Sequence, residues 1–284
     1  MLKRLEAENR NPREYEQAYL ADYLGWGGLS DVFDERKDGQ WKEARDYLKK
    51  NLTSEEYERA RESTLTAFYT PDNVIKAIYK KLKDMGFSGG KVLDPSTGTG
   101  RFIGNLPKDL KGKTNFTAIE LDSITGKIAK YLYPNQNVNI SGYEDFSVSD
   151  NSFDVAITNV PFGNFKVFDN EYNKYNLFIH DYFFKKSIDK VRDGGIIALI
   201  TSSGTMDKKS NDIRKMIDEK ADFLGAVRLP NDLFKNEAGT SVMSDIIFLQ
   251  KNENKEVENE KSEWLTAVPN GYGAIVNNYF LSNP

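Results

Sequence analysis

The stretch Phe153-Asp154-Val155-Ala156-Ile157-Thr158-Asn159-Val160-Pro161-Phe162-Gly163 is the part of this chain from which its fold can be argued. Its apolar run, Val155 to Ile157, predicts a short buried strand that stops at Asn159. Pro161 and Gly163 predict a turn directly after that strand. An amide, a rigid backbone and an aromatic ring would then lie together at the carboxyl end of a strand, which is where open α/β sheets bind ligands.

This stretch resembles the Asn-Pro-Pro-Phe/Tyr motif of the amino-methyltransferases, which use S-adenosylmethionine (SAM) to methylate exocyclic amines. The adenine amino nitrogen is a poor nucleophile, and two acceptors aimed at its hydrogens would stabilise the charge that develops on it. The resemblance implies that Asn159 and the backbone carbonyl of Val160 are these acceptors. It also implies that Pro161 stiffens the turn and that Phe162 stacks on the base. Val160 departs from the family, because proline is usual there.

Composition limits the classes of protein to consider. The chain has 284 residues, enough for one large domain and a small extra one, and its 39% hydrophobic and 29% charged residues are ordinary for a globular protein. It has no cysteine and a single histidine, His180, so a metal site is not expected. No apolar run approaches the length of a membrane span, and the N-terminus lacks a signal-peptide core, which predicts a cytoplasmic protein.

A glycine-rich loop follows the first predicted strand, Lys91 to Asp94. The sequence Asp94-Pro95-Ser96-Thr97-Gly98-Thr99-Gly100 lacks the dinucleotide-binding spacing but resembles the Asp-Pro-x-x-Gly-x-Gly loop of SAM-dependent amino-methyltransferases. The glycines would let the backbone approach a ligand closely. The resemblance implies that Asp94, Thr97, Gly98 and Gly100 bind the cofactor, with the Asp94 carboxylate facing its α-ammonium group.

Two further segments complete the predicted cofactor site. Phe68-Tyr69-Thr70-Pro71 precedes the first strand, and Thr70 is the expected N-cap of a helix that begins at Pro71. A helix N-terminus suits a carboxylate, and the resemblance implies that Phe68, Thr70 and Pro71 hold the methionine end of SAM. Glu120 ends a second predicted strand about 20 positions past the loop, where an acid can accept both ribose hydroxyls, and the resemblance implies that Glu120 takes this role.

The third strand is followed by Tyr143-Glu144-Asp145-Phe146. The family has Asp-Phe at this place, and the resemblance implies that Asp145 accepts from the adenine amine of the cofactor while Phe146 packs nearby. Glu144 remains the alternative, because the sequence does not fix a register of one residue.

The order of the predicted elements indicates the architecture. Strands alternate with helices from residue 67 to 250, which predicts an α/β fold with a parallel sheet. The resemblance implies a Rossmann-like, seven-stranded, mostly parallel sheet in which the first and fourth strands are adjacent. Residues 1–66 read as a small helical subdomain, with helices expected from Pro12, from Gln40 to Asn51 and from Ser54 to about Ser63. Thr53 and Glu56 predict a capping box at the start of the last of these helices. Residues 251–284 read as a charged linker and a C-terminal segment.

The motifs together predict a SAM-dependent DNA methyltransferase domain specific for the exocyclic amine of adenine. Similar motifs serve methylation of RNA or of protein glutamine, and a non-catalytic SAM-binding or DNA-tethering module is a further alternative. Together, the segments Asn159-Val160-Pro161-Phe162-Gly163 and Trp26-Gly27-Gly28 resemble methylase domains of plasmids, phages and conjugative elements, which are often fused to a helicase. Because the formal net charge is −4, we expect weak DNA binding without a separate recognition domain.

Overall fold

A computed structural model describes residues 1–64, 69–231, 243–255 and 262–283. The α-helices are α1 (Leu2–Glu8), α2 (Glu14–Ala21), α3 (Ser30–Phe33), α4 (Gln40–Asn51), α5 (Ser54–Ser63), α6 (Asp72–Asp84), α7 (Arg101–Gly104), α8 (Ser123–Leu132), α9 (Ile179–Lys190), α10 (Gly204–Asp207), α11 (Asp212–Asp218) and α13 (Asn278–Ser282). Short 3-10 turns are η1 (Gly27–Leu29), η2 (Lys108–Leu110), η3 (Asn173–Tyr175) and η4 (Glu263–Leu265).

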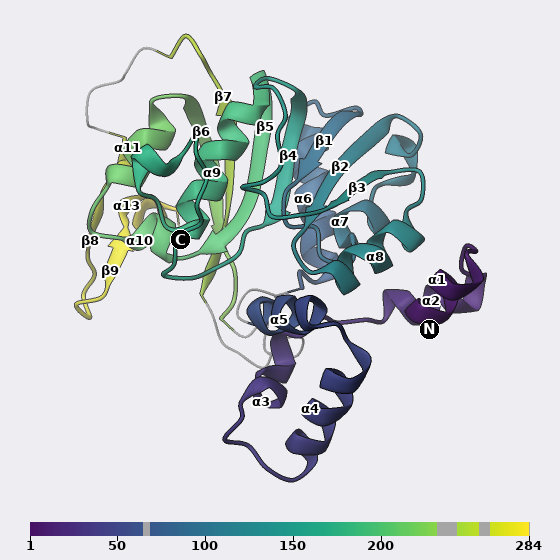
Figure 1. The fold of residues 1–284 in the computed structure, drawn as a ribbon. Helices are drawn as coiled ribbons and strands as arrows, with labels where there is room; N and C mark the ends of the chain where they lie inside the picture. The colour runs from purple at the N-terminus through teal and green to yellow at the C-terminus, as the bar shows by residue number, and fades with distance from the viewer. Residues whose placement is uncertain (65–68, 232–242, 256–261, 284) are drawn as a thin grey trace.

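The strands are β1 (Gly90–Asp94), β2 (Thr114–Glu120), β3 (Asn137–Ile140), β4 (Phe153–Asn159), β5 (Val191–Ser202), β6 (Ala221–Arg228), β7 (Ser244–Lys251), β8 (Ala267–Pro269) and β9 (Ile275–Asn277). The first seven form one sheet in the order β3-β2-β1-β4-β5-β7-β6 (Figure 1). All neighbours are parallel except β7, which runs antiparallel to both β5 and β6. The predicted seven-stranded, mostly parallel sheet is therefore confirmed.

Successive strand residues face opposite sides of the sheet, so each face has its own core. Val92 belongs to the core beneath α6 and α7, whereas its neighbour Leu93 belongs to the core beneath α9 and α11. Helix α6 contributes a continuous apolar stripe, and helix α9 is buried along its whole length. With both faces covered, ligands can reach the sheet only at its edges and at the carboxyl ends of its strands.

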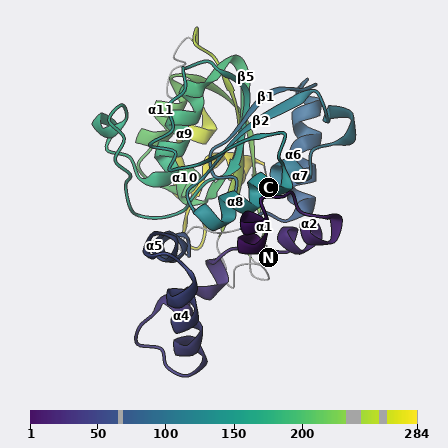
Figure 2. The ribbon, with the colours of Figure 1, turned by 45° about the vertical axis from the view of Figure 1, so that its right-hand side comes forward.

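The N-terminal helices form two separate clusters (Figures 1 and 2). Leu5 of α1 and Leu20 of α2 pack on Ile128 of α8. Helices α3 to α5 build a second small core around Phe33 and Tyr57, and α4 extends away from the sheet.

The sequence predicted the bounds of α4 and α5, and it also predicted the capping box of α5. In this box Thr53 Oγ1 accepts from the Glu56 N–H and the Glu56 carboxylate accepts from the Thr53 N–H. The expected helix start at Pro12 was wrong, because α2 begins at Glu14, where the Glu16 carboxylate accepts from the Arg13 N–H.

The C-terminal residues pack on the same domain. Trp264 is 2% exposed and stacks on Phe223 of β6, with ring centroids 4.8 Å apart. Asn277, at the end of the β8–β9 hairpin, donates its amide to the carbonyls of Met206 and Trp264. Within the described ranges, no helix combines the length and the apolar character needed to cross a membrane.

Candidate functional site

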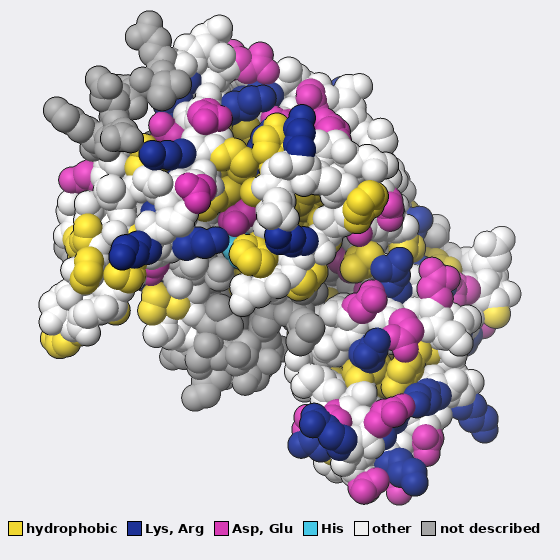
Figure 3. Space-filling model, turned by 60° about the vertical axis from the view of Figure 1, so that its left-hand side comes forward, with side chains coloured by type: hydrophobic (Ala, Val, Ile, Leu, Met, Phe, Trp, Pro, Cys, Tyr) yellow, Lys and Arg dark blue, Asp and Glu magenta, His cyan; other side chains and the backbone are white. Residues whose placement is uncertain are grey.

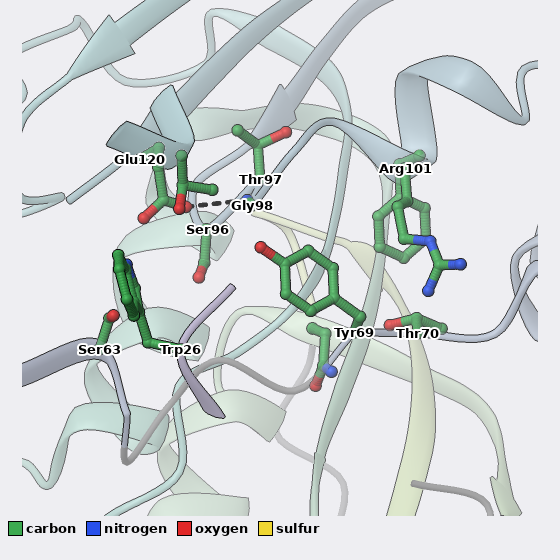
Figure 4. A pocket seen from close by; sticks show the side chains of 12 residues that line it. Trp26, Ser63, Tyr69, Thr70, Ser96, Thr97, Gly98, Arg101 and Glu120 are labelled. Carbon is green, nitrogen blue, oxygen red and sulfur yellow. Dashed lines mark hydrogen bonds between the residues drawn. The ribbon is translucent and has the colours of Figure 1, made fainter. Parts of the chain in front are cut away.

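A pocket opens at the carboxyl ends of β1, β2 and β4 and draws on distant parts of the chain (Figure 4). It is lined by residues from the N-terminal segment, the segment before α6, the loop after β1 and the ends of β2 and β4. These residues are Trp26, Ser63, Tyr69, Thr70, Ser96, Thr97, Gly98, Arg101, Phe102, Glu120, Thr125 and Asn159.

Sheet pairing brings the two central motifs to this pocket. Val92 and Leu93 of β1 pair with Val155 and Ala156 of β4, so the two strands end side by side. The Thr158 hydroxyl then donates to the carbonyl oxygen of Ser96, 3.2 Å away. The loop after β1 and the start of the turn after β4 are thus fixed to each other, and Ser96 and Asn159 line the same pocket.

The family usually has proline at the position of Val160. In this structure the backbone N–H at that position makes a hydrogen bond. Its backbone N–H donates to the carbonyl of Ile200 at 2.9 Å, which continues the β4–β5 ladder by one bond. Its side chain is 2% exposed and packs in the core beneath α9. Proline would lack this donor, so valine anchors the turn by a hydrogen bond in place of a second rigid ring.

Glu120 ends β2 at the wall of the pocket, and its carboxylate is held by backbone amides. The N–H of Gly98 donates to Oε2 at 2.8 Å and the N–H of Asp122 donates to Oε1 at 2.9 Å. Burial raises the pKa of Glu120 to about 7, against the lowering effect of the two amides. Asp122 caps α8 through the N–H groups of Ile124 and Thr125, as expected of a residue that begins the next helix.

The two glycines of the loop both require positive φ angles, +58° at Gly98 and +82° at Gly100, but they make room for different rings. A Cβ on Gly98 would lie 3.1 Å from the Tyr69 ring, inside the pocket. A Cβ on Gly100 would lie 2.5 Å from the Tyr133 ring, which packs against the core. Gly98 therefore shapes the pocket, whereas Gly100 shapes the packing below it.

Asp94 lies beneath the loop and is not among the residues that line the pocket. Its side chain is fully buried, and Oδ2 accepts from the Thr97 hydroxyl at 2.8 Å. Burial raises its pKa to about 6. In this structure Asp94 supports Thr97, which does line the pocket.

The remaining predicted residues are spread around the site. Thr70 lines the pocket, but the helix cap expected there is one residue later: Pro71 is the N-cap and α6 begins at Asp72. Pro71, Phe146 and the rest of the turn after Asn159 lie outside the pocket wall, and Phe68 lies outside the described residues. Asp145 is exposed and Glu144 half-buried, so their alternative remains open.

The loop after Phe162 is anchored by a buried network of charges and aromatic rings. The Asp169 carboxylate accepts from the Tyr182 hydroxyl at 2.7 Å and from Lys186 Nζ at 2.9 Å. Lys186 also donates to the carbonyl of Tyr143 at 2.6 Å, so helix α9 links this loop to the turn before Asp145. Much of the loop is nevertheless exposed, and its side chains Phe165 and Phe168 are 41% and 76% exposed.

Sequence reasoning missed the remaining residues of the pocket wall, namely Trp26, Ser63, Tyr69, Ser96, Arg101, Phe102 and Thr125. The Tyr69 ring lies between two glycines: a Cβ on Gly25 would approach it to 2.7 Å, and one on Gly98 to 3.1 Å. The Arg101 guanidinium lies 5.9 Å from the ring centroid. Tyr69 directly precedes Thr70 in the sequence, so an aromatic side chain next to a predicted cofactor residue was the available signal. Nothing local in the sequence places Trp26 here.

The sheet order, the glycine loop after β1 and the acid at the end of β2 define the Rossmann-like fold of SAM-dependent methyltransferases. Residues 51–274 match the family model of the N-6 DNA methylases, and the chain belongs to that family. The predicted family, the N6-adenine DNA methyltransferases, is thereby confirmed. Among the described residues, no group of three or more acidic or histidine side chains is arranged to hold a metal ion.

Relatives of known sequence or structure agree with this assignment. Over 197 residues the chain is 34% identical to the "Defense against restriction protein B" of Escherichia phage P1, and this match covers 66% of the chain but only 8% of the phage protein. The link to phages that the Trp-Gly-Gly segment indicated is thus supported.

Solved structures are similar in fold at low identity. A Listeria monocytogenes protein assigned to the class I SAM-dependent methyltransferases has a TM-score of 0.57 at 16% identity, with 86% of this chain and 84% of that one covered. The methyltransferase subunit of a type I restriction-modification system from Streptococcus thermophilus has a TM-score of 0.56 at 20% identity, with 70% and 49% covered.

Proposed function

We propose that this chain transfers a methyl group from SAM to the N6 amine of adenine in DNA, with Asn159 and the backbone carbonyl of Val160 as acceptors for the amine. The observation that carries the proposal is the meeting of Asn159 with the Ser96–Gly98 loop in one pocket. A cofactor on the loop and an amine at Asn159 would then be held within reach of each other, and such positioning is a large part of catalysis.

The residues of the pocket fit the cofactor. Gly98 offers a backbone surface that a Cβ would fill, and the Glu120 carboxylate has remaining lone pairs for ribose hydroxyls. In the view of Figure 4, Thr70 and Arg101 lie at the side of the pocket opposite Glu120, where a methionine carboxylate would find a hydroxyl and a guanidinium. We propose that Asp94 acts here by orienting Thr97.

SAM, when bound, would supply an electrophilic methyl group to the amine nitrogen; the electron pair of the broken S–C bond would stay on sulfur, and the methylated amine would release one proton to solvent. The protein groups around the amine stabilise its developing charge and position the base. Asn159 Oδ1 accepts a hydrogen bond from the amine and so stabilises the positive charge that grows on it. Phe162 is half-buried against the core, which fixes a ring beside the base.

A direct test measures transfer of a labelled methyl group to duplex DNA, to RNA and to protein in parallel, followed by chromatography of the digested product. We expect N6-methyl-2′-deoxyadenosine in the DNA reaction. Label in RNA or in protein glutamine would favour those substrates instead. Tight SAM binding without transfer to any of the three would mean a SAM-binding module without catalysis.

The titration of Glu120 should make nucleoside binding depend on pH. Ribose hydroxyls donate to the ionised carboxylate, so affinity should be full above pH 7 and fall below about pH 7, at most about tenfold per pH unit. Calorimetry with 5′-methylthioadenosine, which lacks the amino acid, checks this between pH 5.5 and 8. Glu120→Gln should flatten the profile near pH 7 and leave any smaller step from Asp94. A flat profile in the unaltered protein would contradict the role given to Glu120.

The surface charge predicts weak binding to DNA by this chain alone. Figure 3 shows basic, acidic and apolar side chains interspersed on the face that it draws, without an extended basic patch, and the net charge is −4. We expect a Kd of roughly 10⁻⁴–10⁻⁶ M at physiological salt, rising steeply with salt, in a fluorescence-anisotropy titration. Nanomolar, sequence-selective binding would reveal a recognition surface in this chain. We propose that tight recognition requires a further domain, such as a fused helicase, or another subunit.

A further inference from the structure

Trp26 is a pocket residue that comes from the N-terminal segment, far in sequence from the sheet. It lines the same pocket as Gly98 and Glu120 although its side chain is only 8% exposed. Its ring is fixed by edge-on contacts to Tyr23 and Phe33, with centroids 6.2 and 5.7 Å away. The indole is therefore held in one orientation by its own small core.

The indole nitrogen of Trp26 is a buried donor that remains unsatisfied. Nε1 is fully buried and has no hydrogen-bond partner among the described residues. Leaving a buried N–H unpaired is costly, and most such groups in proteins have a partner. A donor that lines a ligand pocket can obtain this partner from the ligand.

The N-terminal segment packs closely against the pocket and forms part of its wall. Gly25, at a φ of +70°, lets the backbone before Trp26 approach the ring of Tyr69. Ser63, at the end of α5, also lines the pocket, and its hydroxyl donates to the carbonyl of Ala60 at 2.9 Å. Both ends of the α3–α5 cluster therefore meet the pocket.

We propose that Trp26 closes the cofactor site and that its indole N–H donates to a ribose oxygen of the bound SAM; this rests on the function proposed above. Trp26 and Ser63 lie on the Glu120 side of the pocket in Figure 4, away from Thr70 and Arg101. A ribose hydroxyl that donates to Glu120 still has two lone pairs, and an indole N–H can only donate. The two side chains are thus complementary partners of the same hydroxyls, and the N-terminal segment becomes part of the cofactor site.

The indole N–H of each tryptophan gives its own cross-peak in a ¹H–¹⁵N correlation spectrum. The protein has three tryptophans, so uniformly ¹⁵N-labelled protein should give three indole cross-peaks, which Trp41→Phe and Trp264→Phe assign by elimination. Adding S-adenosylhomocysteine or 5′-methylthioadenosine should move the Trp26 peak to higher proton frequency and slow its exchange with water. A Trp26 peak that stays in place at saturating ligand would overturn the proposal.

Calorimetry with Trp26→Phe measures the contribution to affinity. Phenylalanine keeps an aromatic ring between Tyr23 and Phe33 and removes only the N–H, so SAM and 5′-methylthioadenosine should both bind about 2- to 12-fold more weakly. The matched control, Trp41→Phe, alters the same small core away from the pocket and should bind like the unaltered protein.

The outcomes distinguish failure of the proposed function from failure of the role given to Trp26. If the unaltered protein binds no SAM, the proposed function fails and this inference fails with it. If the unaltered protein binds SAM and Trp26→Phe binds equally well, only the role of Trp26 is overturned. A loss for SAM without a loss for 5′-methylthioadenosine would overturn the assignment to ribose.

Discussion

Asn159→Ala should reduce single-turnover methyl transfer by about 10²–10³-fold while the affinity for SAM stays unchanged, because alanine removes one preorganised acceptor and leaves the cofactor loop alone. Asn159 is the last residue of β4, and its backbone is fixed by the pairing with Ile200 of β5. The neighbouring turn is held by the Val160 N–H, so truncating the Asn159 side chain should not move the Val160 carbonyl. The rate is measured by rapid quench with the enzyme and labelled SAM both in excess over DNA.

Asn159→Asp is the matched control for this prediction. Aspartate keeps an oxygen acceptor at the same place and has nearly the same size, so it should retain more transfer than alanine. Equal rates for the unaltered protein and Asn159→Ala would remove Asn159 from the mechanism. Equal losses in both variants would mean that the amide nitrogen of Asn159, rather than its oxygen, matters for catalysis.

Gly98→Val should abolish detectable SAM binding in calorimetry. A β-branched residue is strained at a φ of +58°, and its Cβ would lie 3.1 Å from the ring of Tyr69. The ring is 7% exposed and lies between Gly25 and Gly98, so it has little room to yield. The loop must move instead, and that would break the bond from the Gly98 N–H to Glu120.

Gly112→Val separates backbone strain from collision. Gly112 has a similarly positive φ of +77° but no atom within 4 Å of an added Cβ, and it lies outside the pocket. This variant should lose some stability in a thermal melt and keep its affinity for SAM. Unchanged affinity in Gly98→Val would show that the loop after β1 does not hold the cofactor.

Local sequence features were sufficient to predict buried parallel strands and the helices whose ends carry a signal, whereas the number and order of the strands were implied by the family resemblance. The apolar runs of β1, β4 and β5 are short and have glycine or proline nearby in the sequence. Such runs indicate buried parallel strands, because a strand that is covered on both faces of the sheet is apolar along its length. The capping box of Thr53 and Glu56 gave the start of α5. Helix starts that lack such a side-chain hydrogen bond were predicted less accurately: α2 begins two residues, and α6 one residue, after the expected position. In both cases a proline was taken as the first helical residue, and proline restrains φ but does not by itself supply a cap.

What the sequence by itself determined is the fold class and the identity of the two motifs that meet at Asn159 and Gly98, because strand patterns and loop chemistry are encoded in short, contiguous stretches. The tertiary structure decided which side chains face the pocket. It placed Asp94 beneath the loop, gave Gly100 to the packing of Tyr133, and brought Trp26 to the cofactor side. These outcomes depend on contacts between residues far apart in the chain, and the packing that selects them exists only once the helices have closed on the sheet.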